Sequence, residues 1–290
     1  MSLAPDTHVP KGRPLPQPPR ASQVIDSVTF SIVLYAVIIG LIVYGAYSGA
    51  QAMGYNWQWY RVPQYFYTVT DDGFQWGEIM QGLVKTLTLS ATSFAFATVL
   101  GLIIALLRLS GLVVCTAVSI GFLELIRNIP LLVLLYLFYY VLGPIFGFDR
   151  YTASVLTLGV FHSVLISEIF RAGINAVAKG QWEAATSIGM SKGQAYRYII
   201  LPQSIRFMLP PMTGEVVHMV KSSAIVSVIA VAELTTIGRN IISDTYMSFE
   251  IWFTIAAVYM VVTLILSFGV SLVEKRYAVS QSQPRPNRSL

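Results

Sequence analysis

Long apolar stretches, separated by shorter polar segments, dominate this chain. A helix needs about 20 apolar residues to cross the hydrocarbon core of a bilayer. Lipid leaves the backbone only helices or closed barrels, because every N–H and C=O must be hydrogen-bonded internally. The pattern predicts an all-α membrane protein, a polytopic helical bundle with about six transmembrane helices. Their expected positions are Val28–Ala50, Ile79–Leu107, Ile129–Phe146, Ala153–Val177, Leu209–Ala232 and Ile251–Val273.

The composition supports a membrane protein and excludes an ordinary soluble domain. Hydrophobic residues make up 55% of the chain and charged residues only 11%, whereas soluble domains carry about 25% charged residues. The single cysteine, Cys115, excludes an internal disulfide and a CxxC-type metal site. No spacing of His, Asp and Glu suggests a metal.

The basic residues are distributed unevenly between the two sides of the membrane. Six spans place both termini on one side, whereas the loops of the other side hold little more than Arg61, Arg150 and Arg239. Lys and Arg accumulate on cytoplasmic loops, so we predict that both termini are cytoplasmic and interpret the net charge of +5 as an orientation signal rather than a nucleic-acid footprint. The residues on the predicted cytoplasmic side are Lys11, Arg13, Arg20, Arg108, Lys179, Lys192, Arg197, Arg206, Lys275, Arg276, Arg285 and Arg288.

Four segments organise the chain. Residues 1–22 are polar and rich in proline, lack the apolar core of a signal peptide, and are predicted to form a disordered cytoplasmic tail. Residues 23–77 hold the first helix and an aromatic-rich segment suited to the far membrane interface. Residues 78–275 form the main transmembrane domain, and residues 276–290 form a second cytoplasmic tail.

The polar segment between the fourth and fifth spans, Gly180–Arg206, reads GQWEAATSIGMSKGQAYRYIILPQSIR. It predicts two short helices with a bend between them. The first covers Gln181–Ile188 and ends at Gly189, which tolerates a left-handed C-cap. Ser191 can cap the second helix, and Pro202 is expected to stop it.

The first of these helices carries Glu183 in its first turn, where a carboxylate suits the positive end of the helix dipole. Ala184 and Ala185 leave a smooth surface that can sit deep in a groove of a partner protein. An amphipathic helix lying on the lipid surface is the alternative, and the pattern alone leaves both open.

This segment resembles the EAA loop of ATP-binding-cassette (ABC) importer permeases. The family pattern is EAA, three residues, G, nine residues and I-x-LP, and all its fixed positions are matched. Flanking segments between Gly82 and Leu234 resemble the polar amino acid branch, of the His, Glu, Gln and Arg type; departures at Asn128, Gly214 and Ser222 leave the particular amino acid open. The matching residues of the loop are Glu183, Ala184, Ala185, Gly189, Ile199, Leu201 and Pro202.

The resemblance covers about residues 78–275 and implies a five-helix core, so the first helix looks like an N-terminal addition. It implies a transmembrane permease subunit that carries polar amino acids across the bacterial inner membrane. The EAA loop would dock on separate ABC ATPase subunits, which bind the ATP. This chain has no Walker A signature, so we expect no cofactor and no enzymatic activity.

The implied partners are those ATPases, a periplasmic amino acid-binding protein, the surrounding lipid and a second permease subunit, either another copy or a paralogue. No nucleic acid is expected.

Ionisable residues inside the spans are candidates for the substrate pathway, because they are costly in lipid. Glu168 and Arg171 share a helix face, as a structural ion pair or as substrate contacts. Glu215, His218 and Lys221 follow one another at steps of three and predict one polar stripe, with Ser222 beside it. The stripe could match the two charges of a zwitterionic amino acid, or Lys221 could simply neutralise Glu215.

Two further residues have simpler expected roles. Arg127 is expected to anchor a short interfacial helix at the headgroups, and His162 to form hydrogen bonds near one end of its span. The rival function is an ion-coupled secondary amino acid transporter that uses Glu168 and Glu215 as ion sites. That alternative leaves Gly180–Arg206 unexplained, and a membrane enzyme would need a nucleophile–base pair that the sequence does not show.

Overall fold

The computed structural model describes residues 21–70 and 73–277, so both predicted tails lie almost entirely outside the described residues. Contacts divide the chain into one unit that ends at Trp57 and a larger unit that begins at Gln58. The first unit contains a single long helix, α1 (Ala21–Ala52). The side chains of residues 28–49 are exposed, as expected of an apolar helix with lipid around it. The functional assignment of the four predicted segments stays a prediction.

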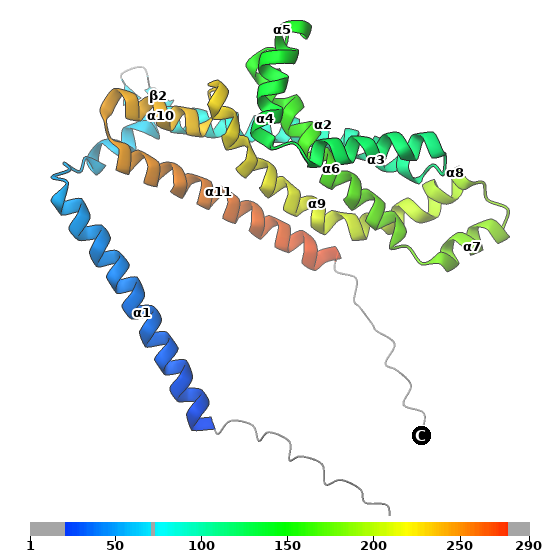
Figure 1. The fold of residues 1–290 in the computed structure, drawn as a ribbon, viewed down its shortest axis with the longest axis horizontal. Coiled ribbons are helices and arrows are strands. Elements are labelled where there is room, and N and C mark those ends of the chain that lie inside the picture. Colours follow the sequence, from blue (N-terminus) through cyan, green and yellow to red (C-terminus); the bar gives the residue numbers. More distant parts are fainter. Residues whose placement is uncertain (1–20, 71–72, 278–290) are drawn as a thin grey trace, which may run out of the picture. The chain divides into compact units, whose positions relative to one another are not determined.

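The larger unit is almost wholly helical (Figure 1). Its first elements are a 3₁₀ turn and a two-stranded hairpin, followed by the helices. In chain order the elements are η1 (Trp59–Tyr65), β1 (Tyr67–Thr70), β2 (Gly73–Trp76), α2 (Glu78–Leu109), α3 (Val113–Arg127), α4 (Leu131–Tyr136), η2 (Leu137–Leu142), α5 (Gly143–Phe146), α6 (Arg150–Asn175), α7 (Lys179–Ser187), α8 (Lys192–Ala195), η3 (Tyr196–Ile200), α9 (Leu201–Ser223), η4 (Ala224–Ile229), α10 (Leu234–Thr245) and α11 (Ser248–Tyr277).

Four helices of the described chain, α1, α2, α6 and α11, are long and apolar enough to cross a membrane one by one. Two bent helix pairs bring the number of candidate spans to six. One pair joins α3 to the segment from α4 to α5 at 103°, and the other joins Lys192–Ile229 to α10 at 46°. This confirms the all-α polytopic class, with four to six spans.

The third predicted span differs from the expected continuous helix Ile129–Phe146. The helix begins at Leu131, after Pro130, and a π-helical turn, η2, separates α4 from α5. Helix α5 ends before Gly147, whose φ of 74° is accessible to glycine at little cost. Hydropathy does not distinguish a π turn from an α-helical turn, because the same run of apolar residues can form either.

Two local elements were not predicted from the sequence. The hairpin pairs Tyr67 with Trp76 and Thr70 with Gly73, within the segment interpreted only as aromatic and interfacial. Helix α10 was hidden in a polar stretch between two spans. Glu233 caps its first turn by accepting hydrogen bonds from the backbone N–H groups of Thr235 at 2.9 Å and Thr236 at 2.8 Å.

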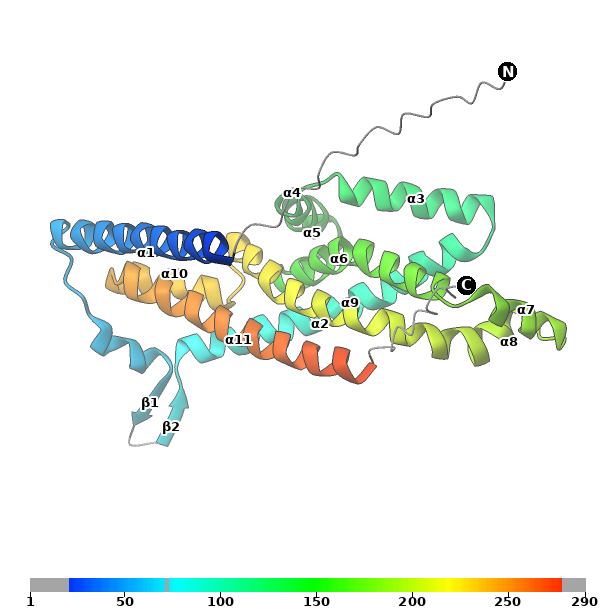
Figure 2. The same cartoon turned by 90° about the horizontal axis from the view of Figure 1, so that it is seen from below.

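Helix α6 is the centre of the bundle, with α2 along one side and α9 along another (Figures 1 and 2). Glycine allows the close approach of α2 to α6. A Cβ atom at Gly101 would lie 2.7 Å from Cγ2 of Ile166 and 3.0 Å from the carbonyl oxygen of Ser163. Small residues serve this purpose in membrane bundles, where van der Waals packing drives helix association.

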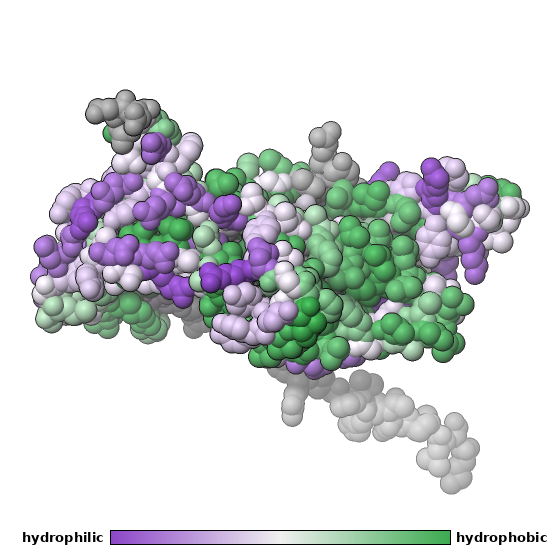
Figure 3. All heavy atoms as spheres, turned by 90° about the horizontal axis from the view of Figure 1, so that it is seen from above, coloured by the Kyte–Doolittle hydropathy of each residue, from purple (hydrophilic) through white to green (hydrophobic). Residues whose placement is uncertain are grey.

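The polar and apolar surfaces of the larger unit are separated along its length. Helices α7 and α8 lie at one end of the helical body, and the hairpin and α10 lie at the other (Figure 2). Hydrophilic residues gather toward both ends of the unit, with a broad hydrophobic surface between them (Figure 3). This zoning suits a body embedded in lipid with α7 and α8 projecting from it.

Candidate coupling and transport sites

The first helix of the predicted coupling segment, α7, begins at Lys179, two residues earlier than expected, so Glu183 lies beyond its first turn and not in it. Its end forms a Schellman motif. The N–H of Met190 donates to the carbonyl oxygen of Ala185 at 3.1 Å, and the N–H of Gly189 donates to that of Thr186 at 3.0 Å. Gly189 has a φ of 77°, which confirms its expected left-handed conformation.

The second helix starts with a capping box, as its sequence indicates. The Ser191 hydroxyl accepts from the Gln194 N–H at 3.4 Å, and the Gln194 side-chain oxygen accepts from the Ser191 N–H at 2.9 Å. The expectation that Pro202 stops this helix was wrong. The chain passes through the π turn η3 into α9, and Pro202 lies in the first turn of α9, where a missing N–H is tolerated.

The matched EAA positions divide into an exposed half and an anchoring half. Glu183, Ala184, Gly189 and Pro202 are exposed, whereas Ala185 is fully buried. Ala184 and Ala185 therefore do not form one smooth outer surface, as the sequence suggested. Successive helical residues are about 100° apart, so Ala184 faces outward while Ala185 faces the packed interior.

The anchoring half is held by apolar and polar contacts with the start of α9. The rings of Trp182 and Tyr196 meet edge to face at 4.9 Å. The Gln203 side-chain amide donates to the Gln181 oxygen at 3.1 Å. The apolar cluster beneath them joins α7 and η3 to the ends of α6 and α9, and its members are Ile169, Ile174, Val177, Ile200 and Met208, with Leu109, Phe170, Trp182, Tyr196, Ile199, Leu201 and Met212 packed against them.

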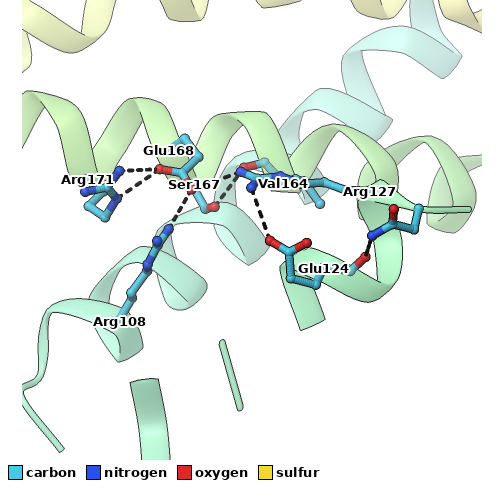
Figure 4. Close-up of polar contacts among 8 residues, drawn as sticks. Arg108, Glu124, Arg127, Val164, Ser167, Glu168 and Arg171 are labelled. Carbon is cyan, nitrogen blue, oxygen red and sulfur yellow. Dashed lines mark hydrogen bonds and ion pairs between the residues drawn. The ribbon is translucent and has the colours of Figure 1, made fainter. Parts of the chain in front are cut away.

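A cluster of three arginines surrounds Glu168 at this end of α6 (Figure 4). Oε1 of Glu168 lies 2.5 Å from Nη1 of Arg108 and 2.9 Å from Nη2 of Arg127. Oε2 lies 2.8 Å from Nη2 of Arg171, the partner that the three-residue spacing indicates. Both oxygens are thus engaged, which favours an ion-pair role for Glu168 over substrate contact. Arg108 and Arg127 come from α2 and α3, and no sequence spacing reveals their approach.

Glu215 is the buried member of the predicted polar stripe. It contacts Nδ1 of His162 across the interface between α6 and α9, and Nδ1 of His218 lies 3.8 Å away. His162 lies in the middle of α6 and not near an end, which corrects the expectation. As an ionisable residue inside a span it was a candidate for such a pairing.

The three residues of the stripe do not face the same way. His218 is 69% exposed and Lys221 is also exposed, and the ion pairs of the described residues do not join Lys221 to Glu215. Each step of three residues turns the helix about 60° short of a full circle, so Lys221 lies about 120° around from Glu215. His218, Lys221 and the half-buried Ser222 remain available to a solute or to another subunit.

A further polar network, which was not predicted from the sequence, connects α10 to α2 and α11. The Tyr259 hydroxyl of α11 donates to Glu233 at 3.0 Å, and the N–H of Leu234 donates to the Thr86 hydroxyl of α2 at 3.1 Å. Glu233 is fully buried, so its hydrogen bonds from Thr235, Thr236 and Tyr259 replace the water that a carboxylate would otherwise require.

A lipid-facing helical bundle with polar residues on its open helix faces, and a helical hairpin anchored at one end, has the architecture of a membrane transport permease. Residues 97–279 match the model of the binding-protein-dependent transport system inner membrane component, and the chain belongs to this family. Members of this family are transport components of the inner membrane rather than enzymes, and they work with ATPase subunits and a substrate-binding protein.

Individual relatives place the chain among amino acid permeases. It is 37% identical over 199 residues to a probable glutamine ABC transporter permease protein, GlnM, of Bacillus subtilis, covering 68% of this chain and 92% of the relative. Identity to the glutamine transport system permease protein GlnP of Escherichia coli K12 is 33% over 204 residues, covering 69% and 93%.

Solved structures agree with this placement. The crystal structure of an amino acid ABC transporter with histidines is 42% identical, with a TM-score of 0.64, over 69% of this chain and 94% of that chain. The MetNI methionine ABC transporter, at 19% identity and a TM-score of 0.61, shares the fold. The chain is therefore a permease subunit of an amino acid ABC importer, as the EAA pattern and the flanking segments together predicted.

Proposed function

We propose that this permease subunit carries polar amino acids and is driven by a separate ATPase that docks on the α7–α8 hairpin. The observation behind this proposal is the division of the EAA positions. Glu183 and Ala184 are exposed on α7, while Ala185, Ile199 and Leu201 anchor the hairpin to the body. An exposed surface on a rigid base suits a part that receives movement from a partner.

The apolar cluster beneath the α7–α8 hairpin would transmit a displacement of the hairpin to the helices of the bundle. It packs Trp182 and Tyr196 against Ile174 of α6 and Met208 of α9. Because such interiors are close-packed, displacing the hairpin displaces α6 and α9 with it. These two helices carry His162 and Glu215 at their interface, so hairpin movement would reach the polar residues of the spans.

Charge reversal on α7 tests the coupling. Glu183→Arg should weaken co-purification of the ATPase and lower ATP-dependent uptake in proteoliposomes at least tenfold, because an exposed carboxylate at the docking surface is inverted. Glu78→Arg is the matched control, since Glu78 is also exposed and is the first residue of α2, whereas the last residue of α2, Leu109, packs beneath α7. Undiminished complex formation and uptake in Glu183→Arg would exclude docking at this surface.

The proposed substrate class rests on two supports. Relatives named as glutamine permeases are 33–37% identical to this chain over about 200 aligned residues. The exposed His218 and Lys221 supply polar groups on an otherwise apolar helix face, and an ammonium group at Lys221 can attract the carboxylate of an amino acid. Glu168, Arg171, Glu215 and Ser222 complete the proposed pathway set, with the two carboxylates and Arg171 acting chiefly through their ion pairs.

Removal of one charge tests the pathway. Lys221→Met should raise the KM for uptake of a polar amino acid several-fold while leaving basal ATP hydrolysis in place. Lys85→Met, at an exposed lysine of α2, is the control. Uptake competition with a panel of amino acids then identifies the substrate. A KM unchanged by Lys221→Met would remove this residue from the pathway.

The remaining partners follow the same proposal. A second permease subunit, a copy or a paralogue, would face the exposed side of α9, and a periplasmic binding protein would deliver the solute. Both termini would be cytoplasmic, together with the hairpin, consistent with the basic residues Lys179 and Lys192 there. Uptake that persists without ATP but collapses with the proton gradient would instead support the secondary transporter.

A further inference from the structure

The arginine cluster around Glu168 carries more positive than negative charge. Three guanidinium groups, from Arg108, Arg127 and Arg171, meet the carboxylate of Glu168. The second carboxylate, from Glu124, lies 3.7 Å from Arg127 and is 62% exposed, so water weakens its effect. Even with both carboxylates counted, one positive charge is left over at the ends of two apolar helices, α2 and α3 (Figure 4).

Arg127 is the member of the cluster with unused hydrogen-bonding capacity. Its side chain is 42% exposed, the largest exposed fraction of the three arginines. The contacts found within residues 21–70 and 73–277 use only its terminal nitrogens, on Glu168 and Glu124. Guanidinium carries five N–H donors in a planar fork, so Nε and part of each terminal group can still donate to an anion.

An apolar groove lies directly beside this arginine. It has a volume of about 260 Å³ and is lined by Arg127 together with Ile126, Phe161, Val164 and Leu165. Leu165 is also 48% exposed on the outer surface of α6. A single cation at the border of an otherwise apolar groove provides one site for a negative group and another for a hydrocarbon chain.

We propose that this site binds an anionic phospholipid, with its phosphodiester on Arg127 and an acyl chain along the groove. Phosphate oxygens match the guanidinium fork, and basic pockets between transmembrane helices hold anionic headgroups. Arg108 lies in the last turn of the apolar helix α2 and its guanidinium reaches Glu168, so the cluster is near the level where this helix reaches the headgroups. A zwitterionic lipid would bring its own cation to a site that already has an excess of positive charge.

The test measures lipid retention by the purified full-length permease in its importer complex. Native mass spectrometry after incubation with phosphatidylglycerol or phosphatidylcholine should show preferential retention of phosphatidylglycerol. Arg127→Gln should lower that retention about fivefold, the effect of one basic residue near a membrane surface. Lys85→Gln, an exposed basic residue on α2 without a guanidinium cluster, should leave it unchanged.

A second variant separates the chain-binding part from the charge. Leu165→Trp fills the mouth of the groove without changing any charge and should also reduce phosphatidylglycerol retention. Equal retention of the two lipids by the wild type, or equal retention by Arg127→Gln and Lys85→Gln, would overturn the proposal. Displacement of the lipid by millimolar inorganic phosphate, together with indifference to Leu165→Trp, would show a plain anion site and would also overturn it. None of these measurements depends on solute transport or on ATPase docking.

Discussion

At the scale of single residues, ionisable groups in the spans find partners on other helices. Glu215 is buried between α6 and α9 and contacts His162, whose side chain is 5% exposed. A carboxylate in such surroundings needs a partner, because an unpaired buried charge costs several kcal/mol. By contrast, Ser93 on α2 is buried and its hydroxyl has no hydrogen-bond partner among the described residues.

This contrast yields a prediction for the pair. His162→Ala should reduce the free energy of unfolding by about 3–5 kcal/mol, because Glu215 loses its closest partner. The double variant His162→Leu/Glu215→Met should recover most of the loss, since packed apolar residues often replace a buried pair at little cost. Thermal or denaturant unfolding of the purified protein in detergent measures both.

Ser93→Ala is the reference variant and should be neutral or mildly stabilising, because it removes a buried hydroxyl without a partner. If the double variant is as unstable as His162→Ala, the loss comes from packing and the account by charge is wrong.

At the scale of elements, the ends of α7 and α8 are set by a few local residues. The Schellman motif at Gly189 and the capping box at Ser191 each use atoms within five residues of one another. Because these motifs depend only on nearby residues, the end of α7 and the start of α8 could be predicted from the sequence. Pro202 was misjudged because the π turn before it belongs to a longer helix, which packing against α6 stabilises.

Two glycines of the α7–α8 hairpin provide a matched test. Gly189→Ala should destabilise the hairpin by about 1 kcal/mol, because alanine at a positive φ is strained. Gly193→Ala should be neutral or stabilising, since Gly193 lies in α8 and alanine favours helix. An added Cβ has open space around it at both positions, so only the backbone differs. Hydrogen exchange of residues 179–195 should rise for the first variant alone; equal exchange in both would contradict the role of φ.

At the scale of the whole molecule, close contact between α2, α6 and α9 positions the sites. The arginine cluster exists only because the ends of α2, α3 and α6 meet at Glu168, and Glu215 is shielded only because α9 packs on α6. In lipid this packing depends on shape, since the hydrophobic effect does not drive helices together there.

Filling a close contact between α2 and α6 should therefore loosen the bundle. Gly101→Leu should destabilise the protein by about 1–3 kcal/mol through overpacking against Ile166 and the backbone at Ser163. Gly121→Leu on α3, where an added Cβ meets nothing within 4 Å, is the control. The melting temperature in detergent should fall for Gly101→Leu only; parallel behaviour of both variants would show that glycine at this contact is not required.

The sequence by itself determined the structural features that depend only on residues close together in the chain. Apolar runs of sufficient length establish a helical membrane protein, since lipid permits few alternatives. The spacing from Glu183 to Pro202 identified the permease family, and Gly189 and Ser191 marked helix ends. Arg171 could be paired with Glu168 from its position three residues along the same helix. None of these required knowledge of distant contacts.

Only the tertiary structure decided which helices meet and which way each side chain faces. It brought Arg108 and Arg127 to Glu168 and placed His162 against Glu215. The position of Lys221, about 120° around α9 from Glu215, by contrast follows from helix geometry and could have been predicted from the sequence. Partners on different helices leave no periodic trace along the chain, because their approach depends on packing of the whole bundle.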